Sequence, residues 1–155
     1  MPDKAPDFEL VSLAGGTRKL SELLAGGPVL LAFYKVTCPT CQLTFPFLQR
    51  LQAATDELQV VGISQDPAAA SQEFNRRNGV TFTTLLDPAD DGTSRFPASN
   101  AYRITNVPTA FLVEPDGTVS QTIAGFHKAE LEQLAARFGV EIFTPGDRVP
   151  VFRPG

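Results

Sequence analysis

The chain of 155 residues, of which 43% are hydrophobic and 19% charged, has the size and composition of one soluble domain with a sizeable core. The sequence has no run of about 18 apolar residues, so no membrane-spanning helix is predicted. The formal net charge is −4 and the basic residues are scattered, which argues against nucleic acid as a partner. No secretory leader is expected at this N-terminus, so a cytoplasmic location is the default unless a leader has been removed.

The first third of the chain predicts a hairpin, a short helix and a buried strand. Residues 8–13 alternate roughly between apolar and polar side chains, and a glycine turn leads to residues 18–20 as the partner strand. Residues 21–24 begin with a capping serine and end before two glycines, which indicates one or two helical turns. Residues 29–35 are apolar without alternation, as expected for a strand covered on both faces.

The hydrophobic period changes to that of a helix at Pro39, because the large apolar residues between positions 43 and 51 share one helical face. Pro46 lies inside this predicted helix and removes a backbone donor. We therefore expect a kink or a local break at Pro46.

The middle of the chain predicts a strand at 58–64, a helix at 67–77 and a strand at 81–86. This order implies right-handed crossovers between parallel neighbours. The acidic stretch at 87–92 is expected to be a solvated loop, and residues 94–103 are expected to form a short helix.

The last third predicts an antiparallel hairpin, in which residues 110–113 and 119–123 flank the turn "EPDG". Residues 128–138 form an amphipathic helix. The Pro- and Gly-containing tail has no helical period and is expected to be an extended strap or a flexible end. The predicted division is a domain at 1–140 and an extended tail at 141–155.

The chain has two cysteines, Cys38 and Cys41, and both lie at a predicted strand-to-helix junction. Positions i and i+3 share a helical face, so a disulfide between them is feasible. The helix N-terminus stabilises an anion and should lower the pKa of Cys38 below its usual value of roughly 8.5. Cys38 is therefore the predicted nucleophile, and Cys41 is the second thiol that resolves a mixed disulfide.

Two other interpretations of the cysteine pair are weighed against the redox interpretation. A closed zinc site needs four ligands, and this chain offers two cysteines and the single histidine, His127. An inert structural pair is the other alternative. The combination of a strand, a Cys-x-x-Cys and a helix in a βαβ setting favours redox chemistry. His127 itself stands between a strand and the last helix, where a helix N-terminal or surface role is expected.

The order of elements, "CPTC" at 38–41 and "VPTAFLVEPDG" at 107–117 together resemble the thioredoxin-like superfamily. The leading "APDFEL" and the extra helical segment before "VPT" are similar to its redoxin and thiol-disulfide oxidoreductase branch, which includes TlpA-like and ResA-like proteins and is related to AhpC/TSA. The resemblance covers about residues 5–138. It implies a three-layer α/β fold in which helices flank a central mixed β-sheet, with an N-terminal β-hairpin as an extension.

The same resemblance implies the site. The Val107-Pro108 bond is expected to be cis and to pack against the cysteine pair, with a free backbone edge at Val107 for an extended substrate peptide. The implied substrate-binding residues are Pro39, Thr40, Val107, Pro108 and Thr109. No cofactor is implied beyond the redox-active Cys38–Cys41 disulfide. The expected partners of this monomer are protein or small-molecule thiols and disulfides, with an electron donor or acceptor.

The sequence departs from the family at three positions. Thr37 replaces the usual tryptophan before the first cysteine. Ala32 stands where many thioredoxins carry a buried aspartate, and Thr44 stands where ResA-type proteins carry a glutamate, so neither familiar proton acceptor for the second cysteine is present. The remaining candidates are Lys35, Tyr34, Glu114 and a water molecule.

Two alternative functions remain open. Peroxiredoxin-like thiol peroxidases share the fold, but they place Thr or Ser three residues before the nucleophile and Pro four residues earlier still. This chain has Lys35 and Leu31 at those places, which counts against peroxidase chemistry. A redox-inactive binding module, whose groove holds a partner peptide, is the second alternative.

Overall fold

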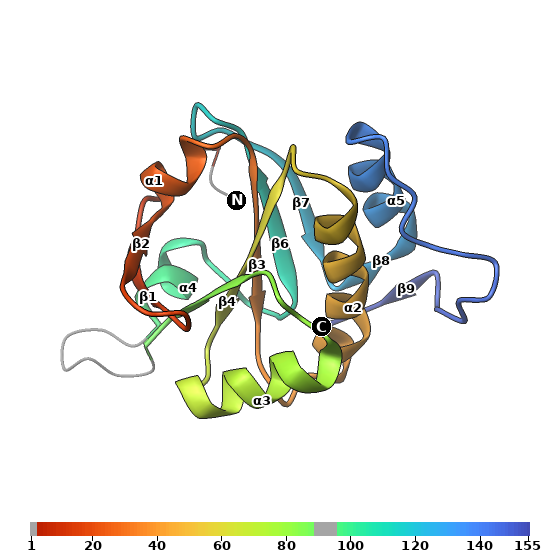
Figure 1. Cartoon of the computed structure of the whole chain (residues 1–155), viewed down its shortest axis with the longest axis horizontal. Helices are drawn as coiled ribbons and strands as arrows, with labels where there is room; N and C mark the ends of the chain where they lie inside the picture. Colours follow the sequence, from red (N-terminus) through yellow and green to blue (C-terminus); the bar gives the residue numbers. More distant parts are fainter. Residues whose placement is uncertain (1–2, 89–95) are drawn as a thin grey trace.

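The computed structural model describes residues 3–88 and 96–155, and its elements are labelled in Figure 1. The strands are β1 (Glu9–Ser12), β2 (Thr17–Lys19), β3 (Val29–Tyr34), β4 (Gln59–Ser64), β5 (Thr83–Leu86), β6 (Thr109–Val113), β7 (Val119–Ala124), β8 (Phe126–His127) and β9 (Phe152–Arg153). The helices are α1 (Leu20–Leu24), α2 (Pro39–Ala54), α3 (Ala68–Asn78), α4 (Pro97–Ala101) and α5 (Lys128–Arg137).

A seven-stranded mixed sheet in the order β2-β1-β5-β4-β3-β6-β7 forms the centre of the molecule. Strand β3 pairs parallel with β4, and β4 pairs parallel with β5, which confirms the predicted parallel neighbours. The hairpin β6–β7 and the N-terminal hairpin β1–β2 are antiparallel, as predicted. The hairpin β1–β2 joins the sheet because β1 pairs antiparallel with β5. The expected thioredoxin-like mixed sheet with an N-terminal hairpin is confirmed.

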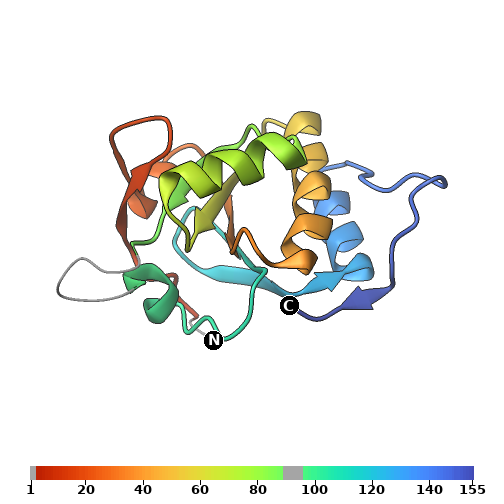
Figure 2. The same ribbon diagram turned by 90° about the horizontal axis from the view of Figure 1, so that it is seen from below.

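Two hydrophobic cores lie on the two faces of this sheet, and β3 contributes to both because its side chains alternate between the faces. Ala32 and Tyr34 point into the core shared with α2, α3 and α5, whereas Leu31 and Phe33 point into the core shared with α1 and α4. Figure 2 shows α2, α3 and α5 gathered on one side of the sheet. Burial on both faces explains the continuous apolar run of β3.

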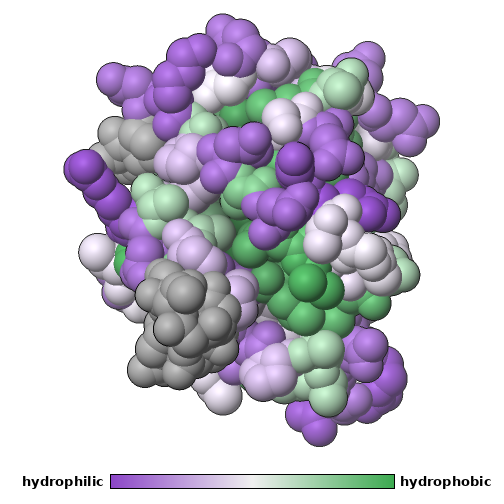
Figure 3. Space-filling model, turned by 90° about the vertical axis from the view of Figure 1, so that its left-hand side faces the viewer, coloured by the Kyte–Doolittle hydropathy of each residue, from purple (hydrophilic) through white to green (hydrophobic). Residues whose placement is uncertain are grey.

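The side of the molecule that carries the hairpin β1–β2 has apolar side chains gathered between polar ones (Figure 3). Val11 of β1 is 53% exposed on this hairpin. A single exposed valine is ordinary for a surface strand.

Of the kink or local break expected at Pro46, the break is wrong, because helix α2 runs from Pro39 to Ala54 without interruption. Proline removes one helical hydrogen bond, but its fixed φ is compatible with the helix. Phe45 and Phe47, the neighbours of Pro46, are both buried in the core, and this packing holds the helix together across the lost bond.

Helix α4 is shorter than the expected 94–103, of which residues 94 and 95 lie outside the described part of the chain. Phe96 has a φ of +51°, which prevents helical geometry before Pro97. The Asp87 carboxylate accepts the amide hydrogens of Ala98 and Ser99 at 3.0 and 2.8 Å, so the helix is capped from a distant strand end. Asp87 is buried, and the expectation of a solvated acidic loop is therefore wrong at this residue. Residues 89–92 of that stretch are not described.

The C-terminal segment, defined here as residues 141–155, is extended and folds back over α2 and α5 (Figure 1). Phe143 packs against the rings of Phe47 and Phe126, with ring centroids 4.6 and 6.0 Å away. Arg50 of α2 pairs with Asp147 at 2.8 Å. The segment then ends in β9, which pairs with β8. Among the residues that the structure describes, no helix is long and apolar enough to cross a membrane.

Candidate active site

Cys38 caps the N-terminus of α2 and is half-buried. Pro39 takes the first helical position, where the absence of an amide hydrogen costs no helical bond. The Cys38 Sγ accepts a hydrogen bond from the Cys41 amide at 3.1 Å. This bond and the positive end of the α2 dipole favour negative charge on the Cys38 sulfur, and a thiolate is the form that attacks a disulfide.

Cys41 lies one turn further along α2, and its side chain is fully buried. Burial raises the pKa of the Cys41 thiol well above its usual range, and the neighbouring Cys38 raises this pKa further. Both thiols are free in this structure. The pair is therefore asymmetric, with a half-buried cysteine at position 38 and a fully buried, protonated one at position 41.

The loop before β6 brings Val107 and Pro108 to the cysteines, and the peptide bond between them is cis, as the resemblance implies. The Cys38 Sγ donates a hydrogen bond to the Val107 carbonyl oxygen at 3.3 Å. The Pro108 carbonyl oxygen accepts the Gly125 amide hydrogen at 2.8 Å, which ties this loop to the junction of β7 and β8. The Thr109 hydroxyl donates to the Asn106 carbonyl oxygen within the same loop.

Thr40 is buried between the two cysteines, and its hydroxyl donates to the Pro154 carbonyl oxygen at 2.8 Å. Gly155 lies directly against Val107, because a Cβ placed on Gly155 would be 2.0 Å from the Val107 carbonyl oxygen. The structure therefore does not leave the backbone edge at Val107 free. The C-terminal segment covers it.

None of the expected side chains is arranged to take the proton of Cys41. Glu114 follows Val113, which pairs with Val29 at the opposite end of β3, and it binds Arg137 there. The pKa of Tyr34 is raised to about 12, chiefly by burial, so its hydroxyl stays protonated. The Lys35 side chain is exposed. At the two positions where family members carry an acidic proton acceptor, Ala32 has no polar group and the Thr44 hydroxyl donates to the Thr40 carbonyl oxygen.

Asp66 is a site residue that the sequence reasoning missed. Its carboxylate accepts the Val36 amide hydrogen at 2.8 Å, and its charge adds to the burial and the Cys38 contact that raise the pKa of Cys41. A sequence signal was available: Asp66 follows β4, and β4 is parallel to β3, so both strands end at the same edge of the sheet. For Pro154 and Gly155 the sequence offered no comparable signal.

His127 occupies the N-cap of α5, where its Nδ1 accepts the Glu130 amide hydrogen at 3.4 Å. The expected helix N-terminal role is confirmed. The described residues, 3–88 and 96–155, contain no group of three or more His, Cys, Asp or Glu side chains arranged to hold a metal ion.

Comparison with known proteins agrees with this geometry. The profile of the AhpC/TSA family matches residues 1–122. The thiol-disulfide oxidoreductase ResA of Geobacillus kaustophilus is 31% identical over 125 residues, which are 78% of this chain and 67% of the relative. The chain thus spans about two thirds of the length of that relative.

Solved structures show the same fold. A Chlorobium tepidum protein assigned as a thiol:disulfide interchange protein DsbE has a TM-score of 0.75 and 30% identity, with 87% of this chain and 92% of that chain covered. A disulfide oxidoreductase of Mycobacterium tuberculosis has a TM-score of 0.68 and 26% identity, with 84% and 95% covered. This chain belongs to the AhpC/TSA family, and it is an oxidoreductase of thiols and disulfides with a thioredoxin-like fold and a Cys-x-x-Cys pair.

Proposed function

We propose that Cys38 is the attacking thiol of this oxidoreductase and that Cys41 resolves the mixed disulfide. The Cys38 thiolate attacks one sulfur of a substrate disulfide, forms a Cys38–substrate disulfide and releases the other sulfur as a thiolate. Cys41 then loses its proton and attacks the Cys38 Sγ, which releases the second substrate thiol and forms the Cys38–Cys41 disulfide. Two electrons pass from the pair to the substrate, and a dithiol substrate drives the same steps in reverse.

The observation that carries this proposal is the difference between the two sulfurs. Cys38 caps α2, is half-buried and accepts the Cys41 amide hydrogen at 3.1 Å, whereas Cys41 is fully buried with a raised pKa. An attacking thiol needs access and negative charge, and a resolving thiol needs only to reach the first sulfur.

Around the cysteines, we propose that the substrate contacts Pro39, Thr40 and the loop Val107-Pro108-Thr109. Pro39 is exposed beside Cys38, and the Val107 carbonyl oxygen accepts the Cys38 thiol hydrogen. The partners would be protein or small-molecule thiols and disulfides, and the working unit would be a monomer. The Mycobacterium tuberculosis relative is described as secreted, which supports an exported location over the cytoplasmic default.

The reduction potential of the Cys38–Cys41 couple tests this proposal. Equilibration in thiol buffers, followed by alkylation and mass measurement, should give a value between about −270 and −120 mV, the range from thioredoxin to DsbA. A value well below about −300 mV, or no disulfide, would contradict an exchange function.

Single cysteine variants separate the two roles. Cys41→Ser should accumulate a mixed disulfide with a peptide disulfide, and Cys38→Ser should not, because only the first sulfur is accessible. Accumulation in Cys38→Ser instead would reverse the roles. The peroxidase alternative would be favoured only if the reduced protein consumed hydrogen peroxide faster than a free thiol does.

A further inference from the structure

The residues from Val151 to Gly155 run along the active site in an extended conformation. Strand β9 pairs antiparallel with β8, so Phe152 lies opposite His127 and Arg153 lies opposite Phe126. The next two residues reach the cysteine pair: the Pro154 carbonyl oxygen accepts the Thr40 hydroxyl hydrogen, and Gly155 lies against Val107. One short stretch of chain therefore touches β8, the Cys-x-x-Cys turn and the loop with the cis bond.

Residues 151–155 contact the site chiefly through main-chain atoms on both sides. A Cβ on Gly125 would lie 2.5 Å from the Arg153 carbonyl oxygen, and a Cβ on Gly155 would lie 2.0 Å from the Val107 carbonyl oxygen. Both positions must be glycine for the stretch to lie here. An extended peptide that adds to a strand edge makes this kind of contact, in which the main chain supplies the affinity.

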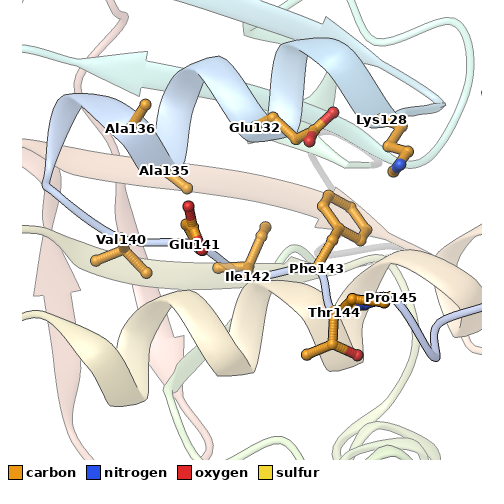
Figure 4. Close-up of a pocket in the computed structure, with 10 residues that line it drawn as sticks. All are labelled: Lys128, Glu132, Ala135, Ala136, Val140, Glu141, Ile142, Phe143, Thr144 and Pro145. Atoms are coloured by element: carbon orange, nitrogen blue, oxygen red, sulfur yellow. The ribbon is translucent and has the colours of Figure 1, made fainter.

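The side chains of residues 151–155 add little to their attachment, which rests on main-chain contacts such as the hydrogen bond from the Lys128 amide to the Val151 carbonyl oxygen at 3.0 Å. All five residues are exposed, and Val151 and Phe152 leave 76% and 52% of their surface in solvent. A two-stranded ribbon such as β8–β9 is marginal by itself. Nearer the start of the segment, a cavity of about 530 Å³ is lined by residues 140–145 and by α5, and Figure 4 shows Phe143 and Lys128 at one end of that cavity. The core below does not depend on these five residues.

We propose that residues 151–155 fill the substrate groove as an intramolecular competitor, and that an extended stretch of a polypeptide substrate replaces them along β8 and Val107. The inference rests on the proposed function, because Cys38 defines the groove. The substrate polypeptide would pair its backbone with β8 and present a residue without a bulky side chain to Val107. It would also place an apolar or aromatic side chain beside His127, as Phe152 does with ring centroids 5.7 Å apart.

Occupation of the substrate groove by residues 151–155 has a measurable consequence. Substrate binds only the fraction of molecules in which the groove is open, so its apparent affinity falls by that fraction. Any change that displaces Gly155 should strengthen substrate binding by the same factor. Loss of one hydrogen bond such as that from Thr40 to Pro154 corresponds to about a fivefold change in such an equilibrium.

Gly155→Ala is the test variant, and Gly146→Ala is its matched control in the same segment. The alanine Cβ at position 155 collides with Val107, whereas at position 146 the nearest atom is 4.0 Å away. Both substitutions are made in a Cys38→Ser, Cys41→Ser protein, and binding of a fluorescent Val-Phe-Arg-Pro-Gly peptide is measured by anisotropy. We expect Gly155→Ala to bind the peptide about fivefold tighter than its parent, and Gly146→Ala to match the parent.

The same two glycine variants with both cysteines intact are assayed with a synthetic peptide disulfide. Gly155→Ala should raise kcat/KM by about the factor seen in binding. Equal or weaker peptide binding by Gly155→Ala would overturn the competitor, even if all variants exchange disulfides. Tighter peptide binding by Gly155→Ala without any exchange activity would support the proposal that residues 151–155 compete with the substrate. It would contradict the proposed disulfide-exchange function.

Discussion

At the scale of single residues, the buried Cys41 thiol couples folding to pH. Burial, followed by the contact with Cys38, raises its pKa in the folded protein, whereas in the unfolded chain the thiol ionises near its usual value of about 8.5. Above that value the unfolded chain has lost a proton that the folded chain keeps. The free energy of unfolding therefore falls as pH rises, by about 1.4 kcal/mol per pH unit for this one group.

We predict that the reduced protein loses this stability between about pH 9 and pH 10 relative to Cys41→Ser. Urea denaturation of both proteins under reducing conditions measures the difference. Below about pH 8 the difference should be constant, since the thiol is protonated in both states. Tyr34, with a pKa raised to about 12, adds a loss of the same sign only above about pH 10, and the variant retains it. A constant difference across the whole range would refute a neutral, buried Cys41.

How well single residues could be predicted depended on how local their environment is. The cap at Cys38 and the first position at Pro39 follow from four consecutive residues, so the sequence was sufficient. Asp66 could be found only by combining two elements, because it reaches the site through the predicted parallel pairing of β4 with β3. Glu114 was a poor candidate for the proton acceptor of Cys41. It follows β6, which is antiparallel to β3 and therefore ends far from the cysteines.

At the scale of elements, β4 packs its glycine beneath an aromatic cluster. A Cβ on Gly62 would lie 3.2 Å from the rings of Phe82 and Tyr34 and 3.5 Å from that of Phe45. These rings also pack on one another, with centroids 4.4 Å apart for Tyr34–Phe45 and 5.7 Å apart for Phe45–Phe82. A methyl group here must push apart rings that already support each other.

Gly62→Ala should therefore lower the free energy of unfolding by about 1–3 kcal/mol, the usual cost of overpacking a core. Chemical denaturation measures this change. Gly26→Ala is the control, since its nearest atom would be 3.7 Å away, and its destabilisation should stay below about 0.5 kcal/mol. Unchanged stability of Gly62→Ala would mean that the aromatic cluster rearranges freely.

Element types were predictable because they follow from hydrophobic period, whereas two boundaries depended on distant contacts. Strand β5 begins at Thr83 and not at residue 81, because the Gln49 side chain takes the amide hydrogens of Thr81 and Phe82. Helix α4 begins where Asp87 caps it. In both cases a side chain from a distant part of the sequence determines where the element begins, so the local sequence pattern does not predict the boundary.

At the scale of the whole molecule, the position of the C-terminal segment was the least predictable feature. Its composition excluded a helix, but contacts with residues about 90 or more positions earlier decide where it lies. Phe143 packs on Phe47, and Asp147 binds Arg50. Such partners share no sequence pattern, so the segment could be predicted as extended while its path to the cysteines could not.

Phe143 is the aromatic anchor of this segment, half-buried beside the buried Ile142, and its removal should loosen the segment while the domain stays folded. The ring contacts Phe47, Phe126 and the Lys128 ammonium, which lies 5.7 Å from its centroid. We predict that Phe143→Ala raises the rate of trypsin cleavage after Arg148 about tenfold or more, because a half-buried phenylalanine contributes on the order of 1–3 kcal/mol.

Phe152→Ala is the matched control within the same segment, since Phe152 is 52% exposed and should change this cleavage by less than about threefold. The urea midpoint of the domain should stay close to that of the parent in both variants, because the sheet and α2 keep their own core. Two outcomes would refute a separable segment. One is a lower urea midpoint for Phe143→Ala without faster cleavage after Arg148. The other is equal cleavage of the two variants, because the segment would then open independently of its apolar anchor.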